Sequence, residues 1–164
     1  MPIEKTVGES LRERGEFVAA AESCTGGLIG SLLTDVPGSS DYFDRSIVTY
    51  SYDAKMEHLG VPRETLDDVG AVSEPVAEQM ARGVRDTAGV TWGVATTGIA
   101  GPTGGTDQKP VGTVYIAISN AAEWGTGESR CRVERYVFDG SRREIKRQIA
   151  ERALEDLHDA VESA

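Results

Sequence analysis

The stretch FVAAAESCTGGLIGSLLTD, residues 17–35, contains the pattern that decides the fold. Residues 17–23 form a short run of mostly small and apolar side chains, which is typical of a strand buried on both faces. A glycine-containing turn follows, and apolar residues then recur at the spacing of one helical face. These residues are Leu28, Ile29, Leu32 and Leu33. Pro37 stops this helix, so the stretch predicts one strand, one turn and one helix.

The rest of the chain repeats this alternation of strands and helices. We predict four further strands, over residues 42–52, 91–100, 111–119 and 128–140. We predict four further helices, over residues 3–14, 53–60, 73–89 and 141–164, and loops over 61–72 and 101–110. A capping box joins Ser141 and Glu144 at the start of the last helix. The alternation predicts one α/β domain, residues 1–164, built as a three-layer α/β/α sandwich with a mixed central sheet.

The composition excludes several classes of protein. The 164 residues carry a net charge of -10, which argues against a nucleic-acid-binding surface, because neutralising phosphates requires clustered Lys and Arg. The two cysteines form neither a disulfide scaffold nor a metal-binding pattern. The apolar runs are too short to span a membrane, and the charged N-terminus does not resemble a signal peptide. We therefore expect a cytoplasmic protein with no nucleic-acid or membrane partner.

Lysine is scarce in this chain, which has four lysines and thirteen arginines. An acidic, lysine-poor surface is typical of proteins from salt-loving organisms, in which carboxylates keep the protein hydrated. An ordinary acidic bacterial protein is the alternative. The scarcity draws attention to each lysine, because Arg cannot be deprotonated in proteins whereas Lys can act as a base.

Three polar blocks follow predicted strands. They are ESCTGG at residues 22–27, TYSYDAK at 49–55 and TTGIAGPTGG at 96–105. In α/β sheets, sites collect at the carboxyl ends of the strands. The common location of the three blocks is therefore the first indication of a functional site.

Ser23, in the first block, is a candidate nucleophile. It lies at the positive end of the helix dipole, where the N–H groups of residues 24–27 can receive a phosphate or a developing oxyanion. The alternative is that Ser23 or Thr25 only caps the helix. Cys24 is the rival nucleophile, but neighbours in an extended segment point to opposite sides, so Ser23 and Cys24 are not expected to share a role.

A nucleophilic serine needs a base, and the two histidines are poor candidates. His158 belongs to an amphipathic helix with a solvated face, and His58 lies near the end of a short helix, where it complements the dipole. Lys55 follows the second predicted strand. If partly buried there, it would have a lowered pKa and could deprotonate a serine, whereas an exposed surface lysine is the alternative. Tyr50 could orient either group, or only pack on its strand.

The third block is too rich in glycine to be an ordinary turn. It satisfies neither a Walker A pattern nor a dinucleotide fingerprint, because Gly98 and Gly101 lack the required spacing. Its glycines let the backbone approach a ligand, Thr97 adds a hydroxyl, and Lys109 on the far side can neutralise a phosphate. A loop that only provides flexibility is the alternative.

These blocks carry a family resemblance. The stretches AAESCTGGLIG, VTYSYDAK, GAVSEPVAEQMA and TTGIAGPTGG…KPVGTVYIAI resemble the C-terminal domain of the competence/damage-inducible protein CinA. The resemblance covers nearly the whole chain. Standalone members of that family are nicotinamide-nucleotide amidohydrolases, also called nicotinamide mononucleotide (NMN) deamidases. Many members carry a nucleotide-processing domain ahead of this one, and we expect a standalone form here.

The resemblance implies a specific reaction, the hydrolysis of NMN to nicotinate mononucleotide and ammonia in NAD recycling. It also implies the α/β/α fold, a homo-oligomer, and no metal or other cofactor. At matching positions it makes Ser23 the nucleophile and Lys55 the base, with Tyr50 close by. It places Thr97 and Gly98 in the loop that helps to shape the site.

Around these residues we expect a substrate-binding surface. Its members are Thr25, Gly26, Gly27, Thr97, Gly98, Gly101 and Lys109. Backbone N–H groups of residues 25–27, or that of Gly98, are expected to hold the oxyanion, and Thr25 is expected to cap the helix. The alternative function is a non-catalytic nucleotide-binding or regulatory module associated with competence or DNA damage.

Overall fold

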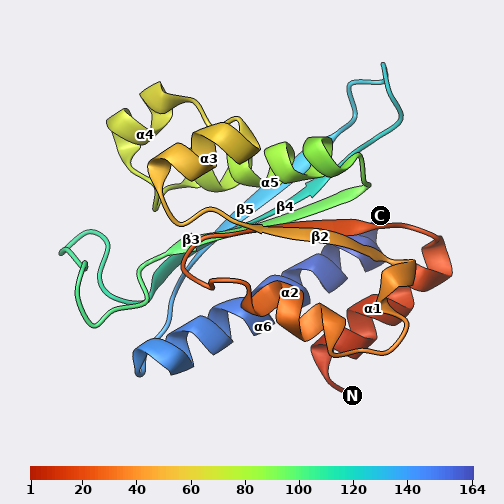
Figure 1. Cartoon of the computed structure of the whole chain (residues 1–164), viewed down its shortest axis with the longest axis horizontal. Helices are drawn as coiled ribbons and strands as arrows, with labels where there is room; N and C mark the ends of the chain where they lie inside the picture. The colour runs from red at the N-terminus through yellow and green to blue at the C-terminus, as the bar shows by residue number, and fades with distance from the viewer.

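The structure, a computed structural model that describes all 164 residues, is built around one five-stranded sheet (Figure 1). The strands lie in the order β2-β1-β3-β4-β5. Their bounds are β1 Val18–Glu22, β2 Phe43–Val48, β3 Trp92–Gly98, β4 Thr113–Asn120 and β5 Arg130–Val137. All five predicted strands are present.

The strand directions make the sheet mixed, as predicted. β1 pairs in parallel with both β2 and β3, β4 runs antiparallel to β3, and β5 runs antiparallel to β4. β5 therefore runs in the same direction as β3. As a result, the carboxyl ends of β1, β2, β3 and β5 all lie at one edge of the sheet, and the segments that leave these strands meet there.

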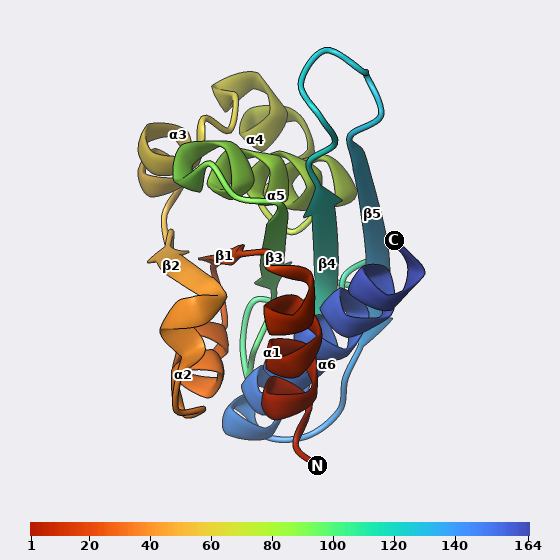
Figure 2. The ribbon, with the colours of Figure 1, turned by 90° about the vertical axis from the view of Figure 1, so that its right-hand side faces the viewer.

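Six α-helices and one short 3-10 helix, η1, cover the two faces of the sheet. Their bounds are α1 Ile3–Arg14, α2 Leu28–Thr34, η1 Ser39–Asp41, α3 Tyr52–Leu59, α4 Arg63–Val69, α5 Glu74–Ala88 and α6 Arg142–Ser163. None of the helices combines the length and the apolar composition that crossing a membrane requires. Helices α1, α2 and α6 lie on one face, and α3, α4 and α5 lie on the other (Figures 1 and 2). This is the predicted three-layer α/β/α sandwich.

Strand β1 is buried on both faces, and its alternation divides the core into two clusters. Val18 and Ala20 pack in the cluster that contains side chains of α1, α2 and α6. Ala19 and Ala21 pack in the cluster formed with α3, α4 and α5. Because successive side chains of a strand point to opposite faces, the same alternation directs Glu22 toward the α2 layer. The residue after it, Ser23, is directed toward the α3 layer.

Two predictions about the helices are wrong. The segment 61–72, predicted as a loop, contains the short helix α4, which buries only Leu66 and so has little periodic signal in the sequence. Ser73 stands at the N-terminus of α5 as predicted, but its side chain does not cap the helix and instead donates to the Gly70 carbonyl at 2.8 Å. The capping box of Ser141 and Glu144 in α6 is confirmed.

Candidate active site

Ser23 and Lys55 meet at the carboxyl end of the sheet. Ser23 directly follows β1, and the Thr49 N–H donates to the Glu22 carbonyl at 2.8 Å, which keeps the turn after β2 beside it. Ser51 caps α3, and Lys55 lies in the first turns of this helix. Lys55 Nζ donates to Ser23 Oγ at 2.9 Å and to the Thr49 carbonyl at 2.5 Å. The two side chains therefore have the hydrogen-bond geometry that proton transfer requires.

Burial gives Lys55 the properties of a base. Only 1% of this residue is exposed, so it is not the surface lysine of the alternative interpretation. The loss of water lowers the pKa of Lys55 to about 8, and the proximity of Cys24 opposes part of this shift. An amine with that pKa is neutral in about one molecule in ten at pH 7. Lys55 can therefore accept a proton near neutral pH.

Cys24 occupies a different environment from Ser23. It is 5% exposed and packs in the apolar cluster on the α1, α2 and α6 side. Burial raises the pKa of Cys24 to about 11, although a hydrogen bond from its own backbone N–H and the positive charges of Lys55, Lys146 and Arg142 oppose the rise. Cys24 is thus a protonated thiol near neutral pH and lacks the reactivity of a thiolate.

Glu22, and not Thr25, caps α2. The residue at the N-terminus of this helix is Gly27, which offers no side chain. The Glu22 carboxylate instead accepts the N–H groups of Ile29 at 2.9 Å and Gly30 at 3.1 Å. The Thr25 hydroxyl donates to the same carboxylate at 2.7 Å and is buried, so it does not face a substrate. The prediction that Thr25 caps α2 is therefore wrong. The capping side chain, Glu22, comes from the preceding strand and not from the adjacent loop.

This cap decides which backbone donors are available for an oxyanion. The N–H of Gly27 donates to the same carboxylate at 3.2 Å, and the N–H of Gly26 donates to the Ser23 carbonyl at 3.1 Å. The N–H groups of Cys24 and Thr25 donate to no other residue of the chain, although the Cys24 N–H interacts with the thiol of its own residue. Of the expected donors in this loop, residues 26 and 27 are occupied, whereas Thr25 is free and Cys24 is free beside it.

Two basic residues of α6, Arg142 and Lys146, stand near this loop. Arg142 Nη2 donates to the Tyr50 hydroxyl at 2.9 Å, and its Nη1 donates to the Gly101 carbonyl at 2.6 Å. A methyl group added to Gly26 would lie 3.8 Å from Lys146 Nζ. In a chain with a net charge of -10, two basic side chains thus stand at this corner of the molecule.

The direction of β5 explains why sequence reasoning missed these two basic residues. Because β5 ends at the same edge as β3, the first turn of α6 lies next to the glycine-rich loop, at the left of Figure 1. In the sequence, Arg142 and Lys146 are two of many charges on an amphipathic helix, and no signal distinguishes them. Tyr50 was expected to orient Ser23 or Lys55, but its exposed side chain bonds to Arg142 and to neither of them.

The glycine-rich loop is also fastened on the side of α4. The buried Thr97 hydroxyl donates to the Ala71 carbonyl at 2.8 Å. Lys109 Nζ donates to the carbonyl of Val69, the last residue of α4, at 3.2 Å. Gly98 ends β3 and is only partly buried. Thr97 and Lys109 therefore hold the loop in place. The register of β1 and β3 places Thr97 next to Ser23 on the same face of the sheet, although its hydroxyl already bonds to Ala71.

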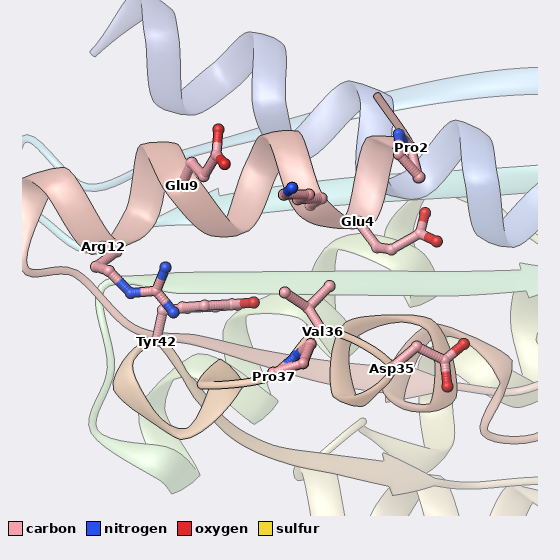
Figure 3. A pocket seen from close by; sticks show the side chains of 9 residues that line it. Pro2, Glu4, Glu9, Arg12, Asp35, Val36, Pro37 and Tyr42 are labelled. Carbon is pink, nitrogen blue, oxygen red and sulfur yellow. The ribbon is translucent and has the colours of Figure 1, made fainter.

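A pocket of about 320 Å³ lies at the other end of the sheet, between α1 and the segment that follows α2 (Figure 3). On its wall the Arg12 guanidinium lies 5.3 Å from the centre of the Tyr42 ring. Tyr42 directly precedes β2, so this pocket is at the amino end of the parallel strands. It contains neither Ser23 nor Lys55. The serine–lysine pair therefore lies outside this pocket.

The fold and the site together define a class of protein. It is an α/β/α sandwich that carries a half-buried serine hydrogen-bonded to a buried lysine at the carboxyl edge of its sheet, a pairing that one group of serine hydrolases uses in place of serine and histidine. The sequence model of the CinA C-terminal domain matches residues 1–161. The chain belongs to this family.

Individual relatives fall into two groups by length. The chain is 44% identical to the nicotinamide-nucleotide amidohydrolase PncC of Escherichia coli K12, over 96% of this chain and 92% of that protein. It is 51% identical to a CinA-like protein of Chlorobium limicola, over 94% of this chain but 35% of that protein. The chain thus spans about a third of the longer relatives and nearly all of the shorter one.

Solved structures share the whole fold. A CinA superfamily protein from Klebsiella pneumoniae superposes with a TM-score of 0.90 at 31% identity, over 99% of this chain and 97% of that one. A competence/damage-inducible protein, CihA, from Agrobacterium tumefaciens has a TM-score of 0.88 at 40% identity, over 98% of this chain and 95% of that one. The sandwich described here is therefore the architecture of the family.

Proposed function

We propose that this protein is a nicotinamide-nucleotide amidohydrolase in which Ser23 is the nucleophile and Lys55 is the base. The observation that carries the proposal is the 2.9 Å hydrogen bond between Lys55 Nζ and Ser23 Oγ, made by a lysine that is shielded from water. The named activity of the Escherichia coli relative supplies the substrate class, a carboxamide on a pyridine nucleotide. A non-catalytic module would have no use for a desolvated lysine held against a serine.

The first half of the reaction forms an acyl-enzyme. Neutral Lys55 takes the proton of Ser23 while Ser23 Oγ attacks the carboxamide carbon, and the carbonyl oxygen becomes an oxyanion. The free N–H groups of Cys24 and Thr25 donate to that oxyanion. Lys55 then passes its proton to the departing amide nitrogen. The C–N bond breaks, ammonia leaves, and an ester links Ser23 to the nicotinoyl group.

The second half of the reaction releases the product acid. A water molecule attacks the ester carbon, and Lys55 takes a proton from this water. The C–O bond to Ser23 breaks, and Lys55 returns the proton to Ser23 Oγ. The products are nicotinate mononucleotide and the free enzyme. Side chains and backbone groups of the chain perform every step, so the proposed mechanism requires no metal and no cofactor, and residues 1–164 act as one amidohydrolase domain.

Arg142 and Lys146 are the groups that we assign to the phosphate of the nucleotide. Both lie at the edge where Ser23 is found, and a guanidinium and an ammonium form strong charge-assisted hydrogen bonds with phosphate oxygens. Lys109 remains a further contributor from the opposite side of the loop, although its ammonium already donates to the Val69 carbonyl. The N-terminus of α2 is not a phosphate site, because the Glu22 carboxylate occupies it.

Ammonia release from NMN tests the proposal. The purified protein is expected to release one ammonia for each nicotinate mononucleotide formed, and a panel of pyridine nucleotides, assayed at low and high salt, defines the substrate range. Activity confined to high salt would support an origin in a salt-loving organism. Binding of NMN without release of ammonia would overturn the proposal and support the regulatory alternative.

A further inference from the structure

Glu22 is a buried charged residue that the reaction described above does not use. The residue has no exposed surface. It directly precedes Ser23, but it points into the opposite layer of the sandwich, where it meets α2. We propose that Glu22 is a positioning residue for catalysis, which holds the loop 23–27 so that the N–H groups of Cys24 and Thr25 are free to receive the oxyanion. This inference rests on the proposed amidohydrolase function.

The contacts of Glu22 show how the loop is held. One carboxylate oxygen, Oε1, accepts three hydrogen bonds, and the other, Oε2, accepts two. The donors to Oε1 are Thr25 Oγ1 at 2.7 Å, Ile29 N at 2.9 Å and Gly27 N at 3.2 Å. The donors to Oε2 are Ser46 Oγ at 2.5 Å and Gly30 N at 3.1 Å. A single side chain therefore ties the loop, the first turn of α2 and the neighbouring strand β2 together.

The same contacts decide which amides stay unpaired. At the start of the loop the Ser23 N–H donates to the Thr96 carbonyl at 3.2 Å, and at its end the Gly27 N–H donates to Glu22. Between these two fixed points, Cys24 and Thr25 present N–H groups that no other residue accepts. A loop that was free to relax could pair these amides with its own carbonyls. Preorganised donors contribute to catalysis because they need no rearrangement when charge develops.

Only a carboxylate meets the demands of this position. An ionised carboxyl group accepts hydrogen bonds on both oxygens and donates none. A glutamine would offer only one oxygen. In one orientation its NH₂ group would face the two donors to Oε2, Gly30 N–H and the Ser46 hydroxyl. In the other orientation the NH₂ group would face the three donors to Oε1. Glu22→Gln therefore keeps the size of the side chain and breaks at least one backbone contact of the loop.

The test combines kinetics with a readout of loop order that does not need activity. Cys24 is buried and is one of only two cysteines, so in a Cys131→Ser background its rate of reaction with a thiol reagent reports opening of the loop. Asp156→Asn is the matched control, because Asp156 is a buried carboxylate on α6 that accepts the Tyr136 hydroxyl at 2.8 Å away from this loop. The melting temperature of each variant measures the purely structural effect.

For Glu22→Gln we expect kcat with NMN to fall about 100-fold, the range found when one oxyanion donor is removed, with KM changed less than about threefold. Cys24 should react at least about tenfold faster than in the parent protein, in line with loss of local order. Asp156→Asn should lower the melting temperature while kcat and the Cys24 rate stay at the parent values.

Unchanged kcat and unchanged Cys24 reactivity in Glu22→Gln would overturn the positioning role. So would a fall in kcat that Asp156→Asn reproduces at equal loss of melting temperature. If Glu22→Gln does not fold, Ser46→Ala removes one of the two donors to Oε2. It should lower kcat less than Glu22→Gln does, with a faster Cys24 reaction, because the hydrogen bond that it removes goes to the carboxylate that holds the loop. Absence of ammonia release from the parent protein would instead overturn the proposed function, and the Cys24 rates would still decide whether Glu22 orders the loop.

Discussion

Glu22 and Lys55 are buried at the same edge of the sheet, but on opposite faces, and their surroundings differ. Glu22 accepts five hydrogen bonds, three of them from backbone N–H groups. Lys55 donates two hydrogen bonds, both to neutral oxygens, and no carboxylate stands beside it. A fully hydrogen-bonded buried charge stabilises the arrangement around it, whereas a poorly compensated one is easily neutralised. The first property suits a residue that holds a loop, and the second suits a base.

The comparison also explains why two adjacent residues, Glu22 and Ser23, have such different roles. A strand directs successive side chains to opposite faces, so one residue meets α2 and the next meets α3. The end of β1 thus places one functional side chain in each of the two helical layers. Structure is maintained on one face, and chemistry is performed on the other.

The largest effect is expected for the nucleophile. Ser23→Ala should reduce kcat for ammonia release by about 10⁴-fold or more, because removal of a nucleophile leaves only binding and oxyanion stabilisation. Cys24→Ala should retain most of the activity, since its thiol is buried and the pKa of Cys24 is raised to about 11. If Cys24→Ala were inactive and Ser23→Ala active, Cys24 would be the nucleophile. The chemistry would then lie on the α2 face of the sheet, which would contradict the comparison above.

Substitution of Lys55 should have the next largest effect. Lys55→Arg and Lys55→Met should both lower kcat by about 10³-fold, which is within the range for loss of a general base, because arginine keeps the charge but cannot accept a proton. Steady-state assays of ammonia release with the two variants measure this. If the Lys55→Arg variant were active, the role of Lys55 would be only to bind the substrate through its positive charge.

Much of the fold was predictable from the sequence because its elements have strong local signals. The strands predicted from apolar runs and the terminal helix predicted from helical spacing are all present in the structure. Helix α4 was not predictable, since seven residues with one buried apolar side chain, Leu66, carry little pattern. The order of the strands was also not predictable, because it depends on pairing between residues far apart in the chain.

Only those residues of the site that follow the end of a strand could be predicted from the sequence. Ser23 and Lys55 were singled out by strand position and by the scarcity of lysine, and the structure places them in contact. Arg142 and Lys146 were missed, since their place depends on the direction of β5. Glu22 was not predicted as the cap of α2. A capping side chain normally comes from the residue just before the helix, whereas Glu22 lies in the preceding strand. The expected homo-oligomer and cytoplasmic location stay predictions.

A smaller effect is expected at the proposed phosphate-binding corner. Arg142→Gln and Lys146→Met should each raise KM for NMN by about tenfold, because each removes a charged hydrogen bond worth about 1.5–3 kcal/mol. The KM for nicotinamide riboside, which lacks the phosphate, should change much less. Arg143→Gln is the matched control, since it removes a neighbouring exposed charge of α6. Equal effects on both substrates would show that these residues do not bind the phosphate.

A separate effect concerns the pH dependence of stability. Lys55 has a pKa of about 8 in the folded protein and 10.5 as its ordinary value, so between these pH values the unfolded chain binds more protons. The stability of the wild type should therefore rise from pH 8 to 10.5 relative to Lys55→Met, by up to about 3 kcal/mol. Urea unfolding of both proteins across this range measures the difference. An unchanged difference would show that Lys55 is not desolvated.

The pH dependence of kcat/KM for ammonia release from NMN tests most directly whether Lys55 is the base for Ser23. Because the base must be neutral in the free enzyme, kcat/KM should rise about tenfold per pH unit below pH 7.5 and level off above an apparent pKa of about 8. A profile that is flat from pH 6 to 9, or that continues to rise toward the ordinary pKa of a lysine, would contradict the assignment of the buried Lys55 as the catalytic base.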